Sequence, residues 1–130
     1  MKRLISLLCC LCLFVSAFAQ TAFQELTLEG ALEKAKTGNK YVFVDCYTSW
    51  CGPCKLMTEK VFPSKTVGDY MHNKFVCVKF DMEKGEGIDI QQKYQIMSCP
   101  TFLVLKTDGT LLSRIVGAIL DEDKYINKVD

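Results

Sequence analysis

The hydrophobic pattern of the chain predicts four strands. Residues 41–47 (YVFVDCY) and 75–81 (FVCVKFD) are apolar runs rich in β-branched and aromatic side chains. Such runs are typical of strands that are buried on both faces of a sheet. Residues 101–106 and 110–116 form a later pair of strand-like runs, separated by Thr107-Asp108-Gly109. This short Asp-Gly connection predicts an antiparallel hairpin.

Helical patterns separate the strand-like runs. A helix over residues 27–37 is predicted from its apolar face and from Gly38, which should end it. A second helix is predicted to begin near residues 51–53 and to end at Phe62-Pro63. Three more helices are predicted over residues 64–72, 88–94 and 121–129, and a polar loop over residues 83–87. Parallel strands with helical crossovers, finished by a hairpin, predict a three-layer α/β/α sandwich around a mixed central sheet.

The N-terminus has a different pattern. Two basic residues precede an apolar run from Leu4 to Phe18, and Ala17-Phe18-Ala19 places small residues where a signal peptidase cleaves. This order predicts a secretory signal peptide over residues 1–19 and one domain over residues 20–130. The run is shorter than the roughly 20 residues that span a bilayer, so an uncleaved anchor is the less favoured alternative. We therefore expect a periplasmic or equivalent exported location.

Charge and cysteine content narrow the possible functions. Sixteen basic and 15 acidic residues give a net charge of +1 without a basic stripe, so nucleic acid is not an expected partner. Three of the eight cysteines fall within the predicted signal peptide. Cys46, Cys77 and Cys99 lie in or beside apolar strand-like runs, which does not suit a disulfide framework. Cys51 and Cys54 are the exception, because the two residues between them give the C-x-x-C spacing of a reactive or metal-binding pair.

The segment Trp50-Cys51-Gly52-Pro53-Cys54 joins a predicted strand to a predicted helix. A C-x-x-C pair fits half of a zinc site, a redox dithiol or an inert disulfide. Zinc would need a second pair of ligands, and His72 is the only histidine, so we expect no metal. The positive end and free N–H groups of a helix N-terminus would lower the pKa of the Cys51 thiol. Cys54 would lie on nearly the same helix face and could resolve a mixed disulfide on the more exposed Cys51, without a cofactor.

These residues resemble the active site of the thioredoxin family. The likeness extends over residues 41–125. The matching positions, in chain order, are Asp45, WCGPC at 50–54 with Lys55, Lys79, Cys99-Pro100-Thr101 and Val116-Gly117-Ala118. The resemblance implies a thioredoxin fold and a thiol–disulfide oxidoreductase. Residues 55–62 look closer to exported members, such as the periplasmic reductase domain of bacterial transmembrane disulfide reducers.

The resemblance also implies roles for residues around the dithiol. Asp45 interrupts a buried strand, and burial should raise its pKa, so it could accept and return the Cys54 proton. The alternative is a structural acid paired with Lys79, the lysine that the resemblance places on the next strand. The expected substrate-binding residues are Trp50, Gly52, Pro53, Cys99, Pro100, Thr101 and Gly117. Trp50 could instead be a packing aromatic, and Pro100 is implied to follow a cis peptide bond.

Cys99 departs from the family pattern, which has an aliphatic residue or threonine before the cis-proline. A small apolar filler is the favoured interpretation, because buried free cysteine often has that role. The alternatives are a thiol that traps Cys51 or tunes its potential, and a thiolate metal site with Cys51 and Cys54. The final predicted helix is short for the family, so the chain could be a fragment of a longer protein.

Three functions remain open. The favoured one is a monomeric disulfide reductase, because a Gly-Pro dipeptide between the cysteines resembles reductases. Its substrates would be disulfide-bearing exported proteins, and its electron donor a membrane thiol reductant. The alternatives are a disulfide oxidase or isomerase, and a docking domain of a larger exported protein with an unused dithiol. The reduction potential separates the first two possibilities.

Overall fold

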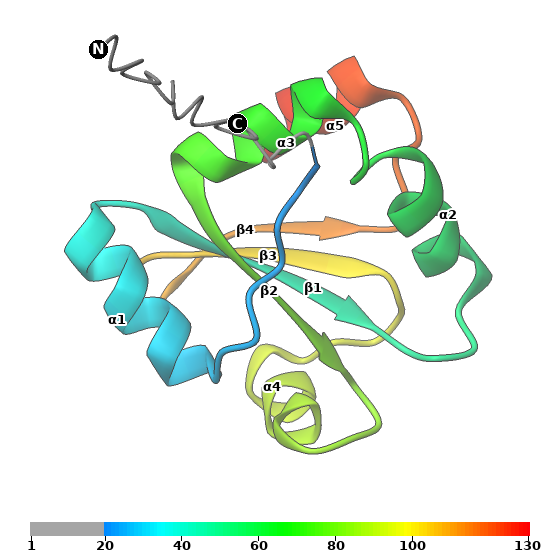
Figure 1. Cartoon of the computed structure of the whole chain (residues 1–130). Coiled ribbons are helices and arrows are strands. Elements are labelled where there is room, and N and C mark those ends of the chain that lie inside the picture. The colour runs from blue at the N-terminus through cyan, green and yellow to red at the C-terminus, as the bar shows by residue number, and fades with distance from the viewer. Residues whose placement is uncertain (1–19) are drawn as a thin grey trace, which may run out of the picture.

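The computed structural model describes residues 20–130, and the predicted signal peptide lies outside the described residues. A four-stranded sheet, ordered β2-β1-β3-β4, forms the middle layer (Figure 1). Its strands are β1 (Tyr41–Tyr47), β2 (Phe75–Asp81), β3 (Thr101–Leu105) and β4 (Leu111–Val116). The bounds of β1 and β2 agree with the sequence prediction, because both runs are rich in β-branched and aromatic residues and each is followed by a turn.

The sheet is mixed, as predicted, but only one pair of strands is parallel. β1 pairs in parallel with β2 and antiparallel with β3, which forms the predicted hairpin with β4. Tyr47 lies opposite Asp81, where β2 ends, and Cys46 lies opposite Thr101, where β3 begins. The segment between β2 and β3 therefore returns the chain at the same end of the sheet, which makes β3 antiparallel to β1.

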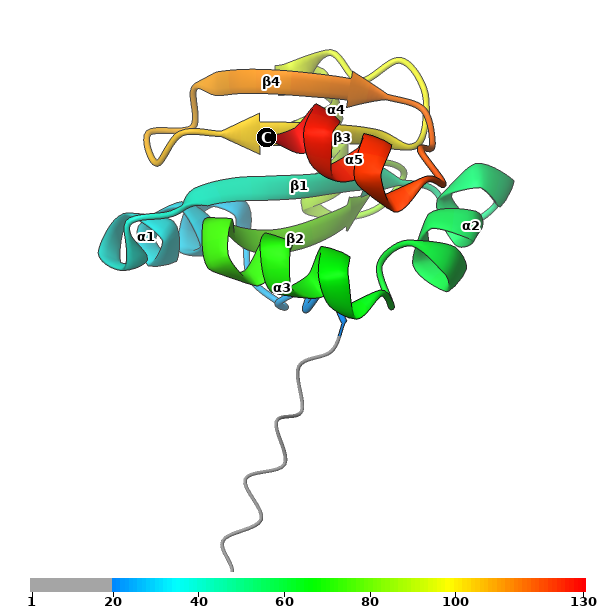
Figure 2. The ribbon, with the colours of Figure 1, turned by 90° about the horizontal axis from the view of Figure 1, so that it is seen from above.

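In the described part of the chain, five helices cover the two faces of the sheet: α1 (Leu28–Gly38), α2 (Gly52–Lys60), α3 (Lys65–Lys74), α4 (Glu86–Tyr94) and α5 (Glu122–Val129). Helices α1 and α4 pack on one face in a core with Val44 and Leu103. Helices α2, α3 and α5 pack on the other face, around Phe43 and Phe102 (Figure 2). The three-layer thioredoxin fold expected from the sequence is thus present.

Side-chain caps fix where four of the helices begin. Thr27, Cys51, Ser64 and Asp121 each accept a hydrogen bond from a backbone N–H in the first turn. Helix α4 begins at Glu86, two residues earlier than predicted, and follows Gly85 at a φ of 52°. The Glu86 carboxylate accepts a hydrogen bond of 3.0 Å from the Leu28 N–H group, a long-range contact that stabilises this earlier start.

Residues 20–24 run beside α3 and β2. The Thr21 N–H donates to the Phe62 carbonyl at 2.7 Å, and the Gln24 N–H donates to the Cys77 carbonyl at 2.8 Å. Phe23 forms an isolated parallel bridge with Cys77, so this segment covers the middle of the β2 edge, while β4 forms the other edge of the sheet. Among residues 20–130, none of the helices has the length and apolar character needed to cross a membrane.

Candidate active site

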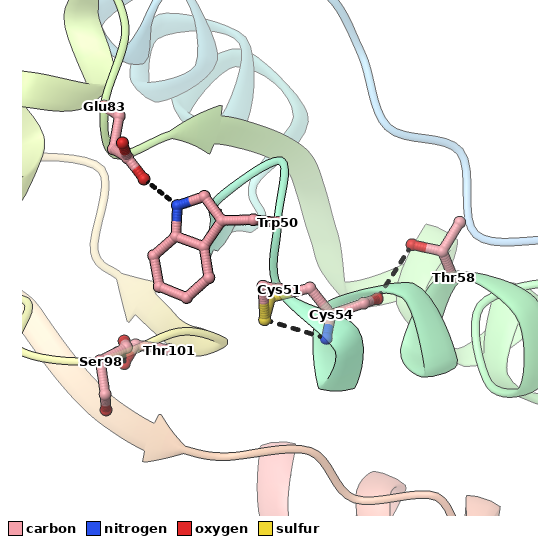
Figure 3. Close-up of a disulfide and its surroundings, with 7 residues drawn as sticks. All are labelled: Trp50, Cys51, Cys54, Thr58, Glu83, Ser98 and Thr101. Atoms are coloured by element: carbon pink, nitrogen blue, oxygen red, sulfur yellow. Dashed lines mark hydrogen bonds between the residues drawn. A yellow bond between two sulfur atoms is a disulfide. The ribbon is translucent and has the colours of Figure 1, made fainter.

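Cys51 and Cys54 form a disulfide at the beginning of α2, with their Cα atoms 5.3 Å apart (Figure 3). Cys51 is the N-cap of the helix, and its sulfur accepts a hydrogen bond of 3.2 Å from the Cys54 N–H group. Pro53 lies in the first turn, where the absence of an N–H group costs no helical hydrogen bond. The C-x-x-C pair therefore occupies the strand-to-helix junction that its sequence context predicted.

The two sulfurs are both shielded in this oxidised form. Cys51 is 4% exposed and Cys54 is 8% exposed. The prediction that Cys51 is the more exposed of the two is therefore wrong for the disulfide state. The Cys51 sulfur accepts the Cys54 N–H in the first turn of α2 in this state. Cys54, unlike Cys51, lines a cavity that Asp45 also lines.

Asp45 lies in the middle of β1 and is 5% exposed. Burial raises the pKa of its carboxyl group from 3.8 to about 7, against a smaller lowering by the positive charge of Lys79. Its Oδ1 atom has no hydrogen-bond partner among the described residues. The cavity that Asp45 shares with Cys54 has a volume of about 210 Å³. This carboxyl group can therefore hold or release a proton near neutral pH beside Cys54.

Lys79 lies opposite Asp45 in the strand register, but the two side chains form no ion pair within 4.0 Å in the described part of the chain. The Lys79 ammonium lies 5.7 Å from the ring centroid of Phe23 and 5.5 Å from that of Tyr47. The alternative of a structural Asp45–Lys79 ion pair does not describe this arrangement.

The segment 99–101, at the start of β3, and Gly117 bring four of the expected substrate-binding residues together. The peptide bond between Cys99 and Pro100 is cis, as the family resemblance implied. The Gly117 N–H donates to the Pro100 carbonyl at 2.9 Å, and Gly117 has a φ of 93°, which favours glycine. The buried Thr101 hydroxyl donates to the Ser98 carbonyl at 2.7 Å, so this side chain is held within the loop.

Cys99 is a free, half-buried cysteine. Burial raises the pKa of its thiol, and the negative charges of Asp45, Asp81 and Glu83 raise it further. A thiol in such surroundings is a poor nucleophile near neutral pH. These observations favour the filler interpretation over a thiol that traps Cys51. In residues 20–130, no group of three or more histidine, cysteine or acidic side chains is placed to hold a metal ion.

Trp50 is not a packing aromatic, because 73% of it is exposed. Its indole N–H donates to the Glu83 carboxylate, which anchors the exposed ring (Figure 3). Trp50 and Glu83 line one side of a groove of about 390 Å³ that continues to Met97 and Cys99. Gly52 and Pro53 are exposed on the first turn of α2. An exposed aromatic beside a dithiol is suited to contact a partner chain.

Sequence reasoning missed two residues of this region. Glu83 was assigned to a loop without a purpose, and nothing in the sequence pairs it with Trp50. The sequence pattern does not single out Thr48, which directly follows β1. It is nevertheless buried and lines the cavity of Asp45 and Cys54. A polar residue directly after a buried strand was the only available signal.

Comparisons with known proteins agree with this site. The model of the thioredoxin-like domain family matches residues 28–130. A thioredoxin H-type from Fagopyrum esculentum is 37% identical over 90 residues, which cover 69% of this chain and 72% of that protein. Thioredoxin-1 from Drosophila melanogaster is 36% identical over 89 residues, covering 68% and 76%.

Solved structures show the same likeness. A candidate disulphide-isomerase from Bacteroides thetaiotaomicron has 42% identity and a TM-score of 0.77, over 86% of this chain and 92% of that chain. The carboxyl-terminal domain of Neisseria meningitidis DsbD has 23% identity and a TM-score of 0.63, over 82% and 94%, which shows a shared fold. The family match, the relatives and the Cys51–Cys54 pair together establish that this chain belongs to the thioredoxin-like family of thiol–disulfide oxidoreductases.

Proposed function

We propose that the protein reduces disulfide bonds in exported proteins through a dithiol–disulfide cycle of Cys51 and Cys54. The observation that carries this proposal is the shared cavity of Cys54 and Asp45, whose carboxyl pKa of about 7 suits it to exchange a proton at neutral pH. A resolving thiol must lose its proton before it attacks, and Asp45 is the buried group placed to take it.

The proposed cycle begins with the reduced pair. The Cys51 thiolate attacks one sulfur of the substrate disulfide, which forms a mixed disulfide and releases the first substrate sulfur as a thiolate. Cys54 then passes its proton to Asp45 and attacks the Cys51 sulfur. The new Cys51–Cys54 bond forms as the mixed disulfide breaks, and the second substrate sulfur leaves. Two electrons have then moved from the protein to the substrate.

The reducing direction is supported by how few groups would stabilise the reduced form. Among the described residues, the Cys54 N–H is the hydrogen-bond donor to the Cys51 sulfur. Gly52 and Pro53, which separate the cysteines, carry no titratable side chain. An oxidant owes its potential to a strongly stabilised dithiol, so this environment favours a reductase. The likeness to a candidate disulphide-isomerase keeps isomerase activity as the second candidate.

The remaining roles belong to the same proposal. Residues 1–19 would direct export to the periplasm and be removed, and residues 20–130 would form the working domain. A membrane thiol reductant would return electrons to the Cys51–Cys54 disulfide. Lys79 would moderate the Asp45 pKa. The substrate chain would lie across Trp50, Gly52, Pro53, Cys99, Pro100, Thr101 and Gly117.

Insulin-disulfide reduction by the purified protein, with dithiothreitol as the electron source, tests the activity. The wild-type protein should be active and Cys51→Ser inactive. Cys77→Ala, which removes a buried free thiol, should keep its activity. Retained activity in Cys51→Ser would overturn the catalytic assignment. A potential near the −270 mV of thioredoxin supports the reductase, and one near about −120 mV identifies an oxidant.

A further inference from the structure

Thr48 places a second unpartnered polar atom in the cavity of Asp45 and Cys54. The residue follows β1 directly and is 6% exposed. Its hydroxyl oxygen, like Asp45 Oδ1, has no hydrogen-bond partner among the described residues. Both residues line the same cavity. Buried polar atoms are nearly always hydrogen-bonded, so two such atoms in one cavity point to a shared ligand.

The size and lining of the cavity suit a water molecule as that ligand. A water molecule needs about 10–15 Å³ of space for its centre and two to four polar partners. The cavity has about 210 Å³, and Asp45 and Thr48 each supply a polar atom without another partner. Ser49 and Thr58 add further hydroxyl groups to its wall.

We propose that the Thr48 hydroxyl is a positioning group for proton transfer, because it holds a water molecule against Asp45 in the cavity that Cys54 lines. This inference rests on the proposed function. When Cys54 attacks the mixed disulfide, its S–H bond breaks and the proton passes through the water to the Asp45 carboxylate. The electron pair on the Cys54 sulfur forms the bond to Cys51, and the substrate sulfur leaves with the electrons of the broken bond. Asp45 returns the proton to Cys54 when the disulfide is next reduced.

Two other polar groups on the cavity wall have contacts of their own. The Thr58 hydroxyl donates to the Cys54 carbonyl at 3.3 Å, and the Lys79 ammonium lies over aromatic rings. Thr48 is also held in place, because its carbonyl accepts a hydrogen bond of 3.3 Å from the Cys51 N–H. Of the residues that line this cavity and the groove beside Trp50, only Thr48 belongs to both. Thr48 is thus the residue shared by the cavity of the buried acid and the proposed substrate groove.

Several titratable or charged groups lie around Asp45 or line the same cavity. They are Cys46 and Tyr47 on β1, Lys79 on β2, Cys54, Lys55 and Glu59 on α2, Cys99 before β3, and Tyr125 on α5. Thr48 is uncharged, so its loss acts on Asp45 through hydrogen bonding alone. Variants of Thr48 therefore change no charge, so their effect on Asp45 can be distinguished from an effect of the neighbouring charged groups.

The test compares Thr48→Val, which keeps the side-chain shape without the hydroxyl, with Thr48→Ser, which keeps the hydroxyl. Thr58→Val is the matched control, because it removes a hydroxyl from the same cavity that is bonded to a carbonyl. The first readout is the titration midpoint of the Asp45 carboxyl carbon, followed by NMR in the oxidised protein. Thr48→Val should raise this midpoint by about one pH unit, because the carboxylate loses its solvating contact. Thr48→Ser and Thr58→Val should titrate like the wild type.

The second readout is the single-turnover release of substrate thiol at pH 7. Thr48→Val should slow this step about tenfold while Cys51 alkylation keeps its rate, and Thr48→Ser should restore it. An unchanged midpoint and release rate in Thr48→Val would overturn the inference. If Thr48→Val does not fold, as judged by circular dichroism, Thr48→Ala provides the same comparison. A wild-type protein that fails to reduce insulin would overturn the proposed function instead, and the Asp45 titration would still decide the role of Thr48.

Discussion

Lys79 faces Asp45 across the β1–β2 register, yet its ammonium group lies over the rings of Phe23 and Tyr47 and forms no ion pair with the carboxylate. Lys79 therefore acts on Asp45 through its charge at a distance, and burial remains the larger influence on the pKa. The acid keeps a pKa near neutrality because no direct partner holds it ionised. This relationship leads to the first two predictions.

Lys79→Met should raise the Asp45 pKa above about 7, because the charge that lowers it is removed. The rise should be less than about one unit, since direct ion pairs account for the larger shifts. NMR titration of the Asp45 carboxyl carbon measures the change. Lys36→Met, on the exposed side of α1, is the control and should leave the midpoint unchanged. An Asp45 midpoint that falls in Lys79→Met would contradict the electrostatic role.

Asp45→Asn should stabilise the oxidised protein at high pH. Well below its ordinary pKa of 3.8 the Asp45 carboxyl is protonated in both states, and it has no effect on stability. As the pH rises toward 7, the unfolded chain ionises before the folded protein does, so the wild type loses stability. The shift from 3.8 to about 7 corresponds to a loss of about 4 kcal/mol.

Urea unfolding at pH 4, 6 and 8 measures this effect. The free energy of unfolding of Asp45→Asn should exceed that of the wild type by a few kcal/mol at pH 8 and approach it at pH 4. Glu33→Gln, which removes an exposed carboxylate, should follow the wild type throughout. A stability difference that does not vary with pH would show that the carboxyl is not held neutral by burial.

Gly87→Ala should destabilise the fold. A Cβ atom at this position would lie 1.8 Å from the Asp81 carbonyl oxygen, a backbone atom that cannot turn aside. Overpacking of this kind costs about 1–3 kcal/mol or more. Thermal unfolding should therefore show a clearly lower Tm. Gly38→Ala is the matched control, because its nearest contacts would be 3.9 Å away on the flexible Lys40 side chain, and alanine favours the helix. Equal Tm values for the two variants would contradict the steric argument.

Cys99→Ala should leave the disulfide exchange largely intact. The Cys99 thiol has a raised pKa and stays mostly protonated at pH 7, so it competes poorly with Cys51 for a disulfide. The turnover of insulin should stay within about a factor of two of the wild type. Iodoacetamide should also label Cys99 more slowly than free cysteine. A large loss of turnover would instead give Cys99 a part in the exchange.

The sequence was most informative where local chemistry alone decides the structure. Strands β1 and β2 could be bounded to the residue, because runs rich in β-branched and aromatic residues give way to turns. Helix α2 could be placed because Cys51, Gly52 and Pro53 form a helix start. The earlier start of α4 could not, since it depends on the Glu86 contact with Leu28, 58 residues away in the chain.

In the candidate site, too, the sequence predicted the features that are set locally and not those that depend on tertiary contacts. The Cys51–Cys54 pair and the buried Asp45 follow from spacing and from one charged residue in an apolar strand. The exposure of Trp50 and its bond to Glu83 depend on a tertiary contact across 33 residues. The Thr48 hydroxyl stands out because no hydrogen-bond partner lies within reach of it among the described residues. Only three-dimensional packing can reveal such an atom.

The bridge between Phe23 and Cys77 has a consequence for self-association. Residues 20–24 occupy the middle of the β2 edge, so strand addition is left with β4, whose outward N–H and C=O groups have no neighbouring strand within residues 20–130. Two copies joined β4 to β4 would use up both available edges. Association by this route would therefore stop at a symmetric pair and could not grow into a fibre.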